Sequence, residues 1–212
     1  MSGTTTGPTE EQPTPLGDRR GLTRSSTATD VALVATFAAL LAVCSFLSIG
    51  IGPVPITLQT FAVLLCGAVL GPWRGLLAVL LYFAVGVAGV PVFSLGVSGL
   101  VIFTGVSAGY AVSFPLVAVV VGLLVRAVPA RADQALRSAL VMLACVVATA
   151  FVVYPLGIAG LMWRADLTFG AAFSVNAAFV PGDLLKCVAV GIVATAVLRA
   201  FPSLATRSRR RP

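Results

Sequence analysis

An acid and a base stand three residues apart in residues 179–186 (FVPGDLLK) of this 212-residue chain. Asp183 and Lys186 begin an apolar stretch that we expect to be helical, so both side chains share one helical face. A charge in a membrane segment costs about 2.5–3.5 kcal/mol on insertion scales and marks a functional site by default. We interpret the pair as a polar clamp for a ligand. Lys186 binds a ligand carboxylate near the positive end of the helix dipole, and Asp183 accepts hydrogen bonds from ligand N–H groups. A self-satisfied ion pair, with Asp183 capping the helix, is the alternative.

A second polar stretch, residues 54–60 (VPITLQT), begins another apolar segment. Thr57 suits the N-cap of a helix there. The amide of Gln59 needs hydrogen-bond partners if it is buried, and substrate contact and helix–helix hydrogen bonding are equally good interpretations of it. Four aromatic residues are candidates for the wall of an apolar pocket, with core packing as the alternative: Tyr82, Phe93, Tyr110 and Tyr154.

The elements that position these residues belong to an integral membrane protein. Apolar residues make up 58% of the chain and charged residues only 10%, against roughly 25% in soluble domains, and the mean hydropathy is +1.05. No charged residue occurs between Asp30 and Arg74, between Arg74 and Arg126, or between Arg137 and Arg164. Each gap exceeds the roughly 20 apolar residues that cross a bilayer, so a soluble core is excluded.

We predict an all-α membrane protein with one domain, residues 30–200, that crosses the bilayer six times. Clusters of proline and glycine separate the apolar stretches, because such clusters do not sustain a helix. Residues 1–29, rich in Thr, Pro, Gly and Ser, are expected to form a disordered cytoplasmic tail, and residues 201–212 a basic cytoplasmic tail. The six transmembrane helices are expected at about residues 30–48, 57–70, 75–87, 105–125, 138–162 and 181–199.

The arginines predict which side of the membrane each loop occupies. With the N-terminus inside, the predicted inner segments carry twelve arginines and the predicted outer loops carry only Arg164. Cytoplasmic segments are enriched in Lys and Arg, so both termini are predicted to be cytoplasmic. Three irregular segments then fall on the outer side and are expected to cover a substrate site: residues 49–56, 88–104 and 163–180.

The rest of the composition argues against catalysis. The chain has no histidine, no phosphate loop, no nucleophile elbow and no metal-ligand cluster. We therefore predict that it is not an enzyme, holds no metal or cofactor, and does not hydrolyse ATP itself. The net charge of +7 collects at the ends of apolar stretches, which indicates membrane topology and not nucleic-acid binding. Four cysteines stand singly in apolar stretches and are expected to pack there: Cys44, Cys66, Cys145 and Cys187.

Small residues form a stripe along the first predicted helix, at Ala35, Ala39 and Ala42. Small residues at four-residue spacing let membrane helices approach closely. Docking to another membrane protein and packing within the molecule are equally good interpretations of this stripe. For Gly105 and Gly109 on the fourth predicted helix, internal packing is the better interpretation.

Five motifs resemble the BioY family, the biotin-binding substrate components of energy-coupling-factor (ECF) transporters. The resemblance covers about residues 31–200, with the motifs in the same order and at compatible spacing. It implies a biotin site near the outer surface, a transmembrane coupling subunit as partner, and a pair of ATP-binding cassette ATPases that hydrolyse the ATP. The motifs are VPITLQT at 54–60, LGPWRG at 70–75, LY at 81–82, GVPVF at 89–93 and PGDLLK at 181–186.

The resemblance implies that Asp183 and Lys186 contact the ligand, and that the alanine stripe faces the coupling subunit. Biotin carries a carboxylate that suits Lys186, ureido N–H groups that suit Asp183, and an apolar thioether ring that suits the aromatic residues. We therefore predict biotin uptake across the cytoplasmic membrane. The alternatives are a substrate component for another small carboxylate-bearing vitamin, and a structural membrane protein.

The chain departs from the family pattern at two places. Leu95 stands in a loop where the family usually has a polar residue, often an amide. Residues 105–110 (GVSAGY) replace the family's Gly-Pro-Thr-Gly-Gly before an aromatic.

Overall fold

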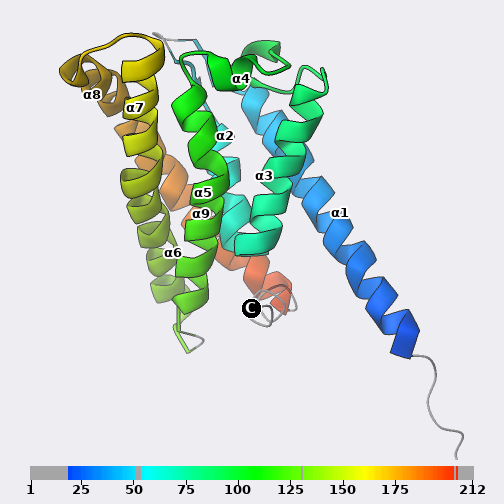
Figure 1. The fold of residues 1–212 in the computed structure, drawn as a ribbon. Helices are drawn as coiled ribbons and strands as arrows, with labels where there is room; N and C mark the ends of the chain where they lie inside the picture. Colours follow the sequence, from blue (N-terminus) through cyan, green and yellow to red (C-terminus); the bar gives the residue numbers. More distant parts are fainter. Residues whose placement is uncertain (1–18, 51–53, 130, 203, 205–212) are drawn as a thin grey trace, which may run out of the picture.

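The computed structural model describes residues 19–50, 54–129, 131–202 and 204, and these fold as a bundle of helices (Figure 1). Two short antiparallel strands, β1 (Ser48–Ile49) and β2 (Ile56–Thr57), join the first two helices. The helical elements are α1 (Arg19–Phe46), α2 (Gln59–Leu65), the π-helix η1 (Cys66–Leu70), α3 (Pro72–Val87), the 3-10 helix η2 (Ser94–Gly96), α4 (Val101–Thr104), α5 (Ala108–Ala127), α6 (Gln134–Ala148), the π-helix η3 (Thr149–Val153), α7 (Tyr154–Arg164), α8 (Phe169–Ala177) and α9 (Val180–Ala200).

The all-helical membrane class predicted from the sequence is confirmed. Four helices in the described part of the chain are long and apolar enough to cross a membrane: Thr27–Phe46, Ala108–Ala127, Gln134–Arg164 and Val180–Ala200. Two further apolar helices, Gln59–Leu70 and Pro72–Val87, are shorter. They match the second and third predicted spans, but whether they cross a bilayer stays a prediction.

The first helix begins earlier than the sequence indicates. Helix α1 starts at Arg19, so residues 19–29 are helical and do not belong to the expected disordered tail. Once an apolar segment has nucleated a helix, each added residue contributes a hydrogen bond at little cost, so polar residues before it can extend the helix. The rest of that tail, residues 1–18, and most of the predicted basic tail lie outside the described residues.

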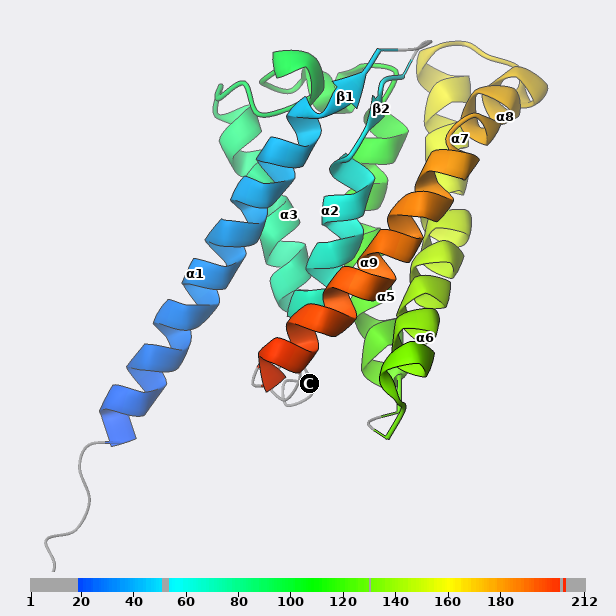
Figure 2. The ribbon, with the colours of Figure 1, turned by 180° about the vertical axis from the view of Figure 1, so that it is seen from behind.

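Short elements lie together at one end of the bundle, where irregular loops were expected (Figures 1 and 2). The strands β1 and β2, the turns η2 and α4, and the helix α8 occupy this end, which we call the loop end. Helix α8 falls within a segment expected to be a loop. It is capped by Thr168, whose hydroxyl oxygen accepts from the backbone N–H of Ala171 at 3.4 Å.

The fifth predicted span is one continuous helix of 31 residues, built from α6, η3 and α7. The π-helical turn η3 ends two residues before Pro155, which has no N–H to donate to the helix ladder. Such π-bulges shift the register of a helix and occur often at functional sites. Here the turn precedes Tyr154 and ends at Val153, which lines the site described below.

Close packing between α5 and α7 depends on small residues. A Cβ atom on Gly109 of α5 would lie 2.1 Å from the carbonyl oxygen of Leu156 and 2.8 Å from the Cα atom of Gly160 on α7. Internal packing is therefore confirmed for Gly109, whereas a Cβ on Gly105 would meet only its own turn.

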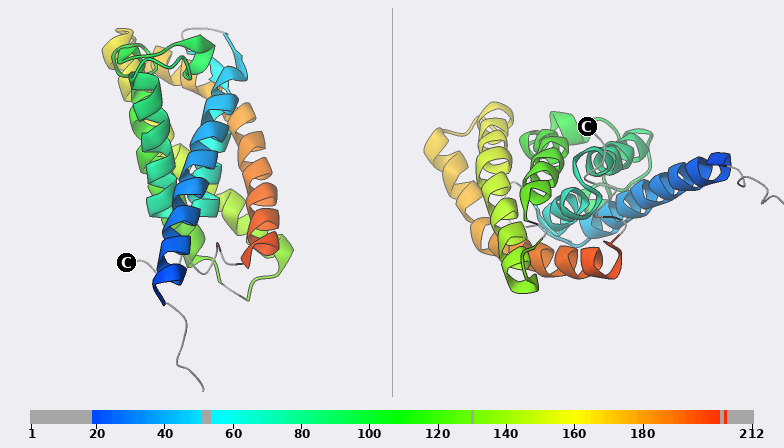
Figure 3. Two further views of the ribbon diagram at one scale, coloured as in Figure 1. Left: turned by 90° about the vertical axis from the view of Figure 1, so that its right-hand side faces the viewer. Right: turned by 90° about the horizontal axis from the view of Figure 1, so that it is seen from below.

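The four cysteines are free and buried, as expected. The start of α1 leans away from the other helices (Figure 3).

Candidate functional site

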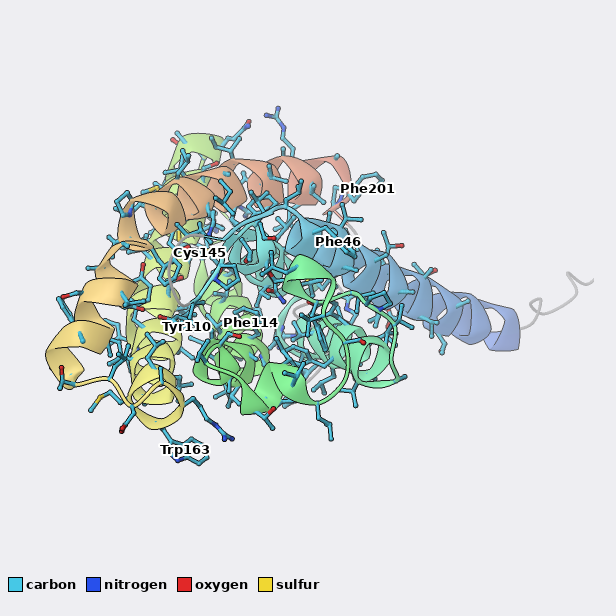
Figure 4. All side chains as sticks on the ribbon, turned by 90° about the horizontal axis from the view of Figure 1, so that it is seen from above. Phe46, Tyr110, Phe114, Cys145, Trp163 and Phe201 are labelled. Carbon is cyan, nitrogen blue, oxygen red and sulfur yellow. The ribbon has the colours of Figure 1, made fainter. Side chains whose placement is uncertain are left out.

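A small cavity lies beneath the loop end, between α2, α5 and the start of α9. Its volume is about 60 Å³. Tyr110 and Phe114, which belong to its wall, project from α5 into the middle of the bundle when it is viewed from the loop end (Figure 4). The described lining residues are Val54, Pro55, Thr57, Gln59, Thr60, Ser94, Ile102, Ser107, Tyr110, Ala111, Phe114, Val153, Phe179, Asp183 and Lys186.

Asp183 and Lys186 reach the cavity from the first turns of α9. The Lys186 Nζ atom lies 2.9 Å from Asp183 Oδ1, and the second carboxylate oxygen, Oδ2, accepts from the Tyr154 hydroxyl at 3.2 Å. Both side chains are nearly buried, with 12% of Lys186 and 8% of Asp183 exposed. Phe179 is the N-cap of α9 and Asp183 is the fourth residue of the helix, so Asp183 is not its N-cap. The ammonium has three protons and the carboxylate about four lone-pair sites, so both keep capacity for a ligand.

Gln59, at the start of α2, is oriented by a short chain of hydrogen bonds. Its Nε2 donates to the Tyr82 hydroxyl at 2.8 Å, and that hydroxyl donates to the carbonyl oxygen of Val92 at 3.2 Å. Because the single hydroxyl proton of Tyr82 goes to the carbonyl, Tyr82 can only accept from Gln59. The amide NH₂ must therefore turn toward Tyr82, which leaves Oε1 as the atom that accepts from a ligand. The helix–helix hydrogen bond expected of Gln59 is therefore present; Gln59 also lines the cavity, and its contact with a substrate stays a prediction.

Thr57, expected to be the N-cap of this helix, stands one residue before that position. Leu58 is the N-cap and makes no side-chain capping bond. The Thr57 hydroxyl oxygen instead accepts from the backbone N–H of Gln59 at 3.2 Å. The hydroxyl thus still satisfies one backbone group at the start of α2 while its residue lines the cavity.

An aromatic wall closes the cavity on the side of α5. The rings of Tyr110 and Phe179 meet edge to face, with centroids 5.8 Å apart. The Tyr110 hydroxyl donates to Asn176 Oδ1 on α8 at 3.0 Å, so the loop-end helix fixes this ring from above. This wall supplies the apolar surface that a ring-containing ligand needs.

Two of the predicted aromatic residues lie elsewhere. Tyr82 and Phe93 are 1% and 0% exposed, pack edge to face at 5.4 Å, and are not among the described residues that line the cavity. Tyr82 acts on the cavity only through Gln59. Tyr154 also stands behind the wall, where it bonds Asp183.

Ser94 and Leu95 are neighbours in the loop, but only Ser94 lines the cavity. Leu95 adopts a positive φ of 60° that turns its side chain outward, and 64% of it is exposed. Ser94 lines the cavity, and its buried hydroxyl has no hydrogen-bond partner among the described residues. A buried polar group left unpaired costs about 1–3 kcal/mol, so a ligand group is the natural partner. Sequence reasoning missed Ser94 because nothing local separates it from neighbouring loop serines.

The alanine stripe of α1 divides between two faces. Ala35 and Ala39 are exposed, Ala42 is half-buried, and Ala38 is buried against the bundle. Close packing within the molecule therefore uses Ala38, and an outer face that includes Ala35 and Ala39 is left open to a partner.

The cavity thus combines a cation, a carboxylate, an amide oxygen, hydroxyls and an aromatic wall. This set fits a small molecule that carries a carboxylate, N–H donors and an apolar ring. No group of His, Cys, Asp and Glu side chains able to hold a metal ion occurs in the described part of the chain. Ligand pockets usually measure roughly 300–1,000 Å³, so a vitamin-sized ligand must widen this cavity as it binds.

Comparison with known proteins identifies the family: residues 18–203 match the BioY family model, and the chain belongs to that family. It is 39% identical over 191 residues to the biotin transporter BioY of Rhodobacter capsulatus, covering 82% of this chain and 95% of that protein. It is 36% identical over 183 residues to the biotin transporter BioY of Rhizobium etli, covering 84% and 98%.

A solved structure has the same fold. It is the S-component for biotin from an ECF-type ABC transporter, with a TM-score of 0.77 and 23% sequence identity, over 82% of this chain and 93% of that one. Together with the four apolar helices of membrane length, the family places this chain among multi-pass membrane proteins that are not enzymes.

Proposed function

We propose that this protein captures biotin in the cavity beneath the loop end, as the substrate component of an ECF-type transporter of the cytoplasmic membrane. One observation carries the proposal: Asp183, Lys186 and Gln59 come from two separate helices and converge on one cavity with an aromatic wall. The relatives in Rhodobacter capsulatus and Rhizobium etli, both biotin transporters by name, support biotin as the ligand.

Each polar part of biotin has a partner of matching chemistry in the cavity. The valerate carboxylate takes the Lys186 ammonium, which offers a charge-assisted hydrogen bond. The two ureido N–H groups donate hydrogen bonds to the Asp183 carboxylate and to Gln59 Oε1. The ureido oxygen accepts a hydrogen bond from the Ser94 hydroxyl. The thioether ring lies against Tyr110, Phe114 and Phe179.

The wider assembly is also part of the proposal. The chain crosses the membrane six times with both termini in the cytoplasm. This orientation places twelve arginines on the inner side and only Arg164 on the outer side, and cytoplasmic segments are enriched in such residues. The exposed face of α1 around Ala35 and Ala39 docks on a transmembrane coupling subunit. A pair of ABC ATPases hydrolyses ATP for transport, and this chain needs no cofactor of its own.

Binding of radiolabelled biotin to the purified protein in detergent tests the proposal. We expect saturable binding by the wild type and its loss in Asp183→Asn. Asp166→Asn is the matched control, because Asp166 is an exposed aspartate of the same end and asparagine tolerates its positive φ of 52°. A folded wild type that binds no biotin, or an Asp183→Asn variant that binds as well as the control, would contradict the proposal.

A further inference from the structure

The start of α6 and the last turns of α9 lie at the end of the bundle opposite the loop end (Figure 2). Residues of both line a second cavity. Its volume is about 340 Å³. The biotin proposal does not use it, and it stands apart from the polar cavity described above. Its described lining residues are Ala132, Gln134, Arg137, Thr195 and Arg199.

Thr195 is one of the lining residues and has an unused hydroxyl. The residue is only 2% exposed, and its Oγ1 has no hydrogen-bond partner among the described residues. A threonine inside a helix usually bonds the carbonyl four residues earlier, and Thr195 does not. A buried hydroxyl without a partner is costly, so the position favours a polar ligand that completes it.

The charge of the lining selects an anion. Arg137 and Arg199 supply two cationic guanidinium groups, and Gln134 Oε1 accepts from Arg199 Nη1, which holds that group in place. The positive end of the α6 dipole adds to the field. The nearby Asp133 carboxylate is not among the lining residues and caps α6 by accepting from Leu136 N at 2.7 Å. Paired guanidinium groups with a hydroxyl fit the oxygens of a phosphate.

The position of the cavity points to a lipid as the source of that phosphate. It lies at the ends of two helices of membrane length, Gln134–Arg164 and Val180–Ala200. The ends of helices that cross a bilayer reach its headgroup region. Leu136 and Ile192 on these helices are 50% and 60% exposed, so acyl chains meet apolar surface beside it. Basic pockets between membrane helices bind anionic headgroups. We propose that this cavity binds the phosphate of an anionic phospholipid.

A lipid titration tests this site. The purified protein in uncharged detergent is titrated with phosphatidylglycerol, phosphatidylcholine or inorganic phosphate at constant ionic strength, and thermal unfolding reports the apparent affinity. We expect phosphatidylglycerol to stabilise the wild type at much lower concentration than phosphatidylcholine. Arg137→Gln and Arg199→Gln should each weaken that affinity about fivefold. Thr195→Val, which keeps the side-chain shape, should weaken it less, and biotin binding should not change in any of them.

Arg131→Gln is the matched control, since Arg131 is an exposed arginine beside this end that does not line the cavity. Equal stabilisation by both lipids in the wild type would overturn the proposal without reference to any variant. An affinity loss in Arg131→Gln as large as that in the cavity variants would overturn it as well. If inorganic phosphate stabilises the protein as strongly as phosphatidylglycerol does, the cavity binds free phosphate and the lipid proposal is wrong.

Discussion

Asp183 and Lys186 form a buried ion pair, and the biotin proposal gives the same two residues a ligand-binding role. The ion pair neutralises two charges that are expensive within a membrane protein, and the Tyr154 hydroxyl satisfies the second carboxylate oxygen. The same pair lines the cavity with unused hydrogen-bonding capacity. A variant that removes one partner therefore affects stability and binding together, and these effects must be separated.

A double variant separates them. Lys186→Met leaves a buried carboxylate without its cation, and breaking a buried pair in this way costs about 3–5 kcal/mol. We expect Lys186→Met to lower the melting temperature in detergent and to abolish biotin binding. Adding Asp183→Asn removes the unpaired charge, so the double variant should recover most of the melting temperature but none of the binding. Recovery of biotin binding in the double variant would refute the clamp.

Ser94 is a cavity-lining residue that sequence reasoning did not identify. Because its hydroxyl has no partner among the described residues, Ser94→Ala should not destabilise the protein. It should weaken biotin binding about fivefold, the equivalent of one ordinary hydrogen bond of about 1 kcal/mol. Leu95→Ala is the control and should leave binding unchanged, because that side chain points away from the cavity. The comparison requires equilibrium binding on both variants; a larger loss for Leu95→Ala would show that the loop adopts another conformation when biotin binds.

At the scale of elements, the cavity depends on how closely α5 and α7 approach each other. Gly109 and Gly160 face one another across this contact, and a Cβ on either would lie within 2.6–2.8 Å of the other's backbone. This contact sets the distance between Tyr110 on α5 and Tyr154 on α7. The aromatic wall and the hydrogen bond to Asp183 therefore share one structural support.

We expect Gly109→Ala to separate these helices. Overpacking a tight contact costs about 1–3 kcal/mol, which should appear as a lower melting temperature. Biotin binding should weaken as well, because the wall moves with α5. Gly170→Ala on α8 is the control, since a Cβ there meets nothing within 4 Å. Equal melting temperatures for the two variants would show that the helices tolerate the extra methyl group.

At the scale of the whole molecule, the proposed ligand site and the proposed docking face are different surfaces. The polar cavity lies under the loop end, whereas α1 runs along the side of the bundle (Figure 3). Ala35 and Ala39 on α1 are exposed. Small residues permit a partner helix to approach closely. Changes on this face should therefore affect assembly and leave ligand capture intact.

The double variant Ala35→Leu/Ala39→Leu tests this separation. We expect unchanged biotin binding to the isolated protein, together with reduced copurification with the coupling subunit and reduced biotin uptake by cells. Ala196→Leu, which adds the same bulk at an exposed position of α9, should leave both unchanged. Normal uptake in the double variant would remove the α1 face from the docking surface.

The sequence by itself determined the class of the protein, the main helices and the charged pair. These follow from local properties: long apolar stretches, prolines and glycines that end helices, and an acid and a base at helical spacing. The BioY motifs are likewise short and contiguous, so the family was visible without coordinates. Helix α8 and the early start of α1 were missed, because their polar and glycine-containing sequences resemble loops.

Only the tertiary structure decided which side chains meet. Gln59 and Tyr82 are 23 residues apart, and Tyr154 and Asp183 are 29 apart, yet each pair shares a hydrogen bond. Whether Tyr82 lines the cavity or stands behind Gln59 depends on the rotation of α3 against α2, and helical periodicity does not contain that rotation. The same holds for Ser94 and Leu95, where a single backbone angle turned one side chain inward and the other outward. Sequence periodicity describes one element at a time, whereas a binding cavity is formed by the packing of several.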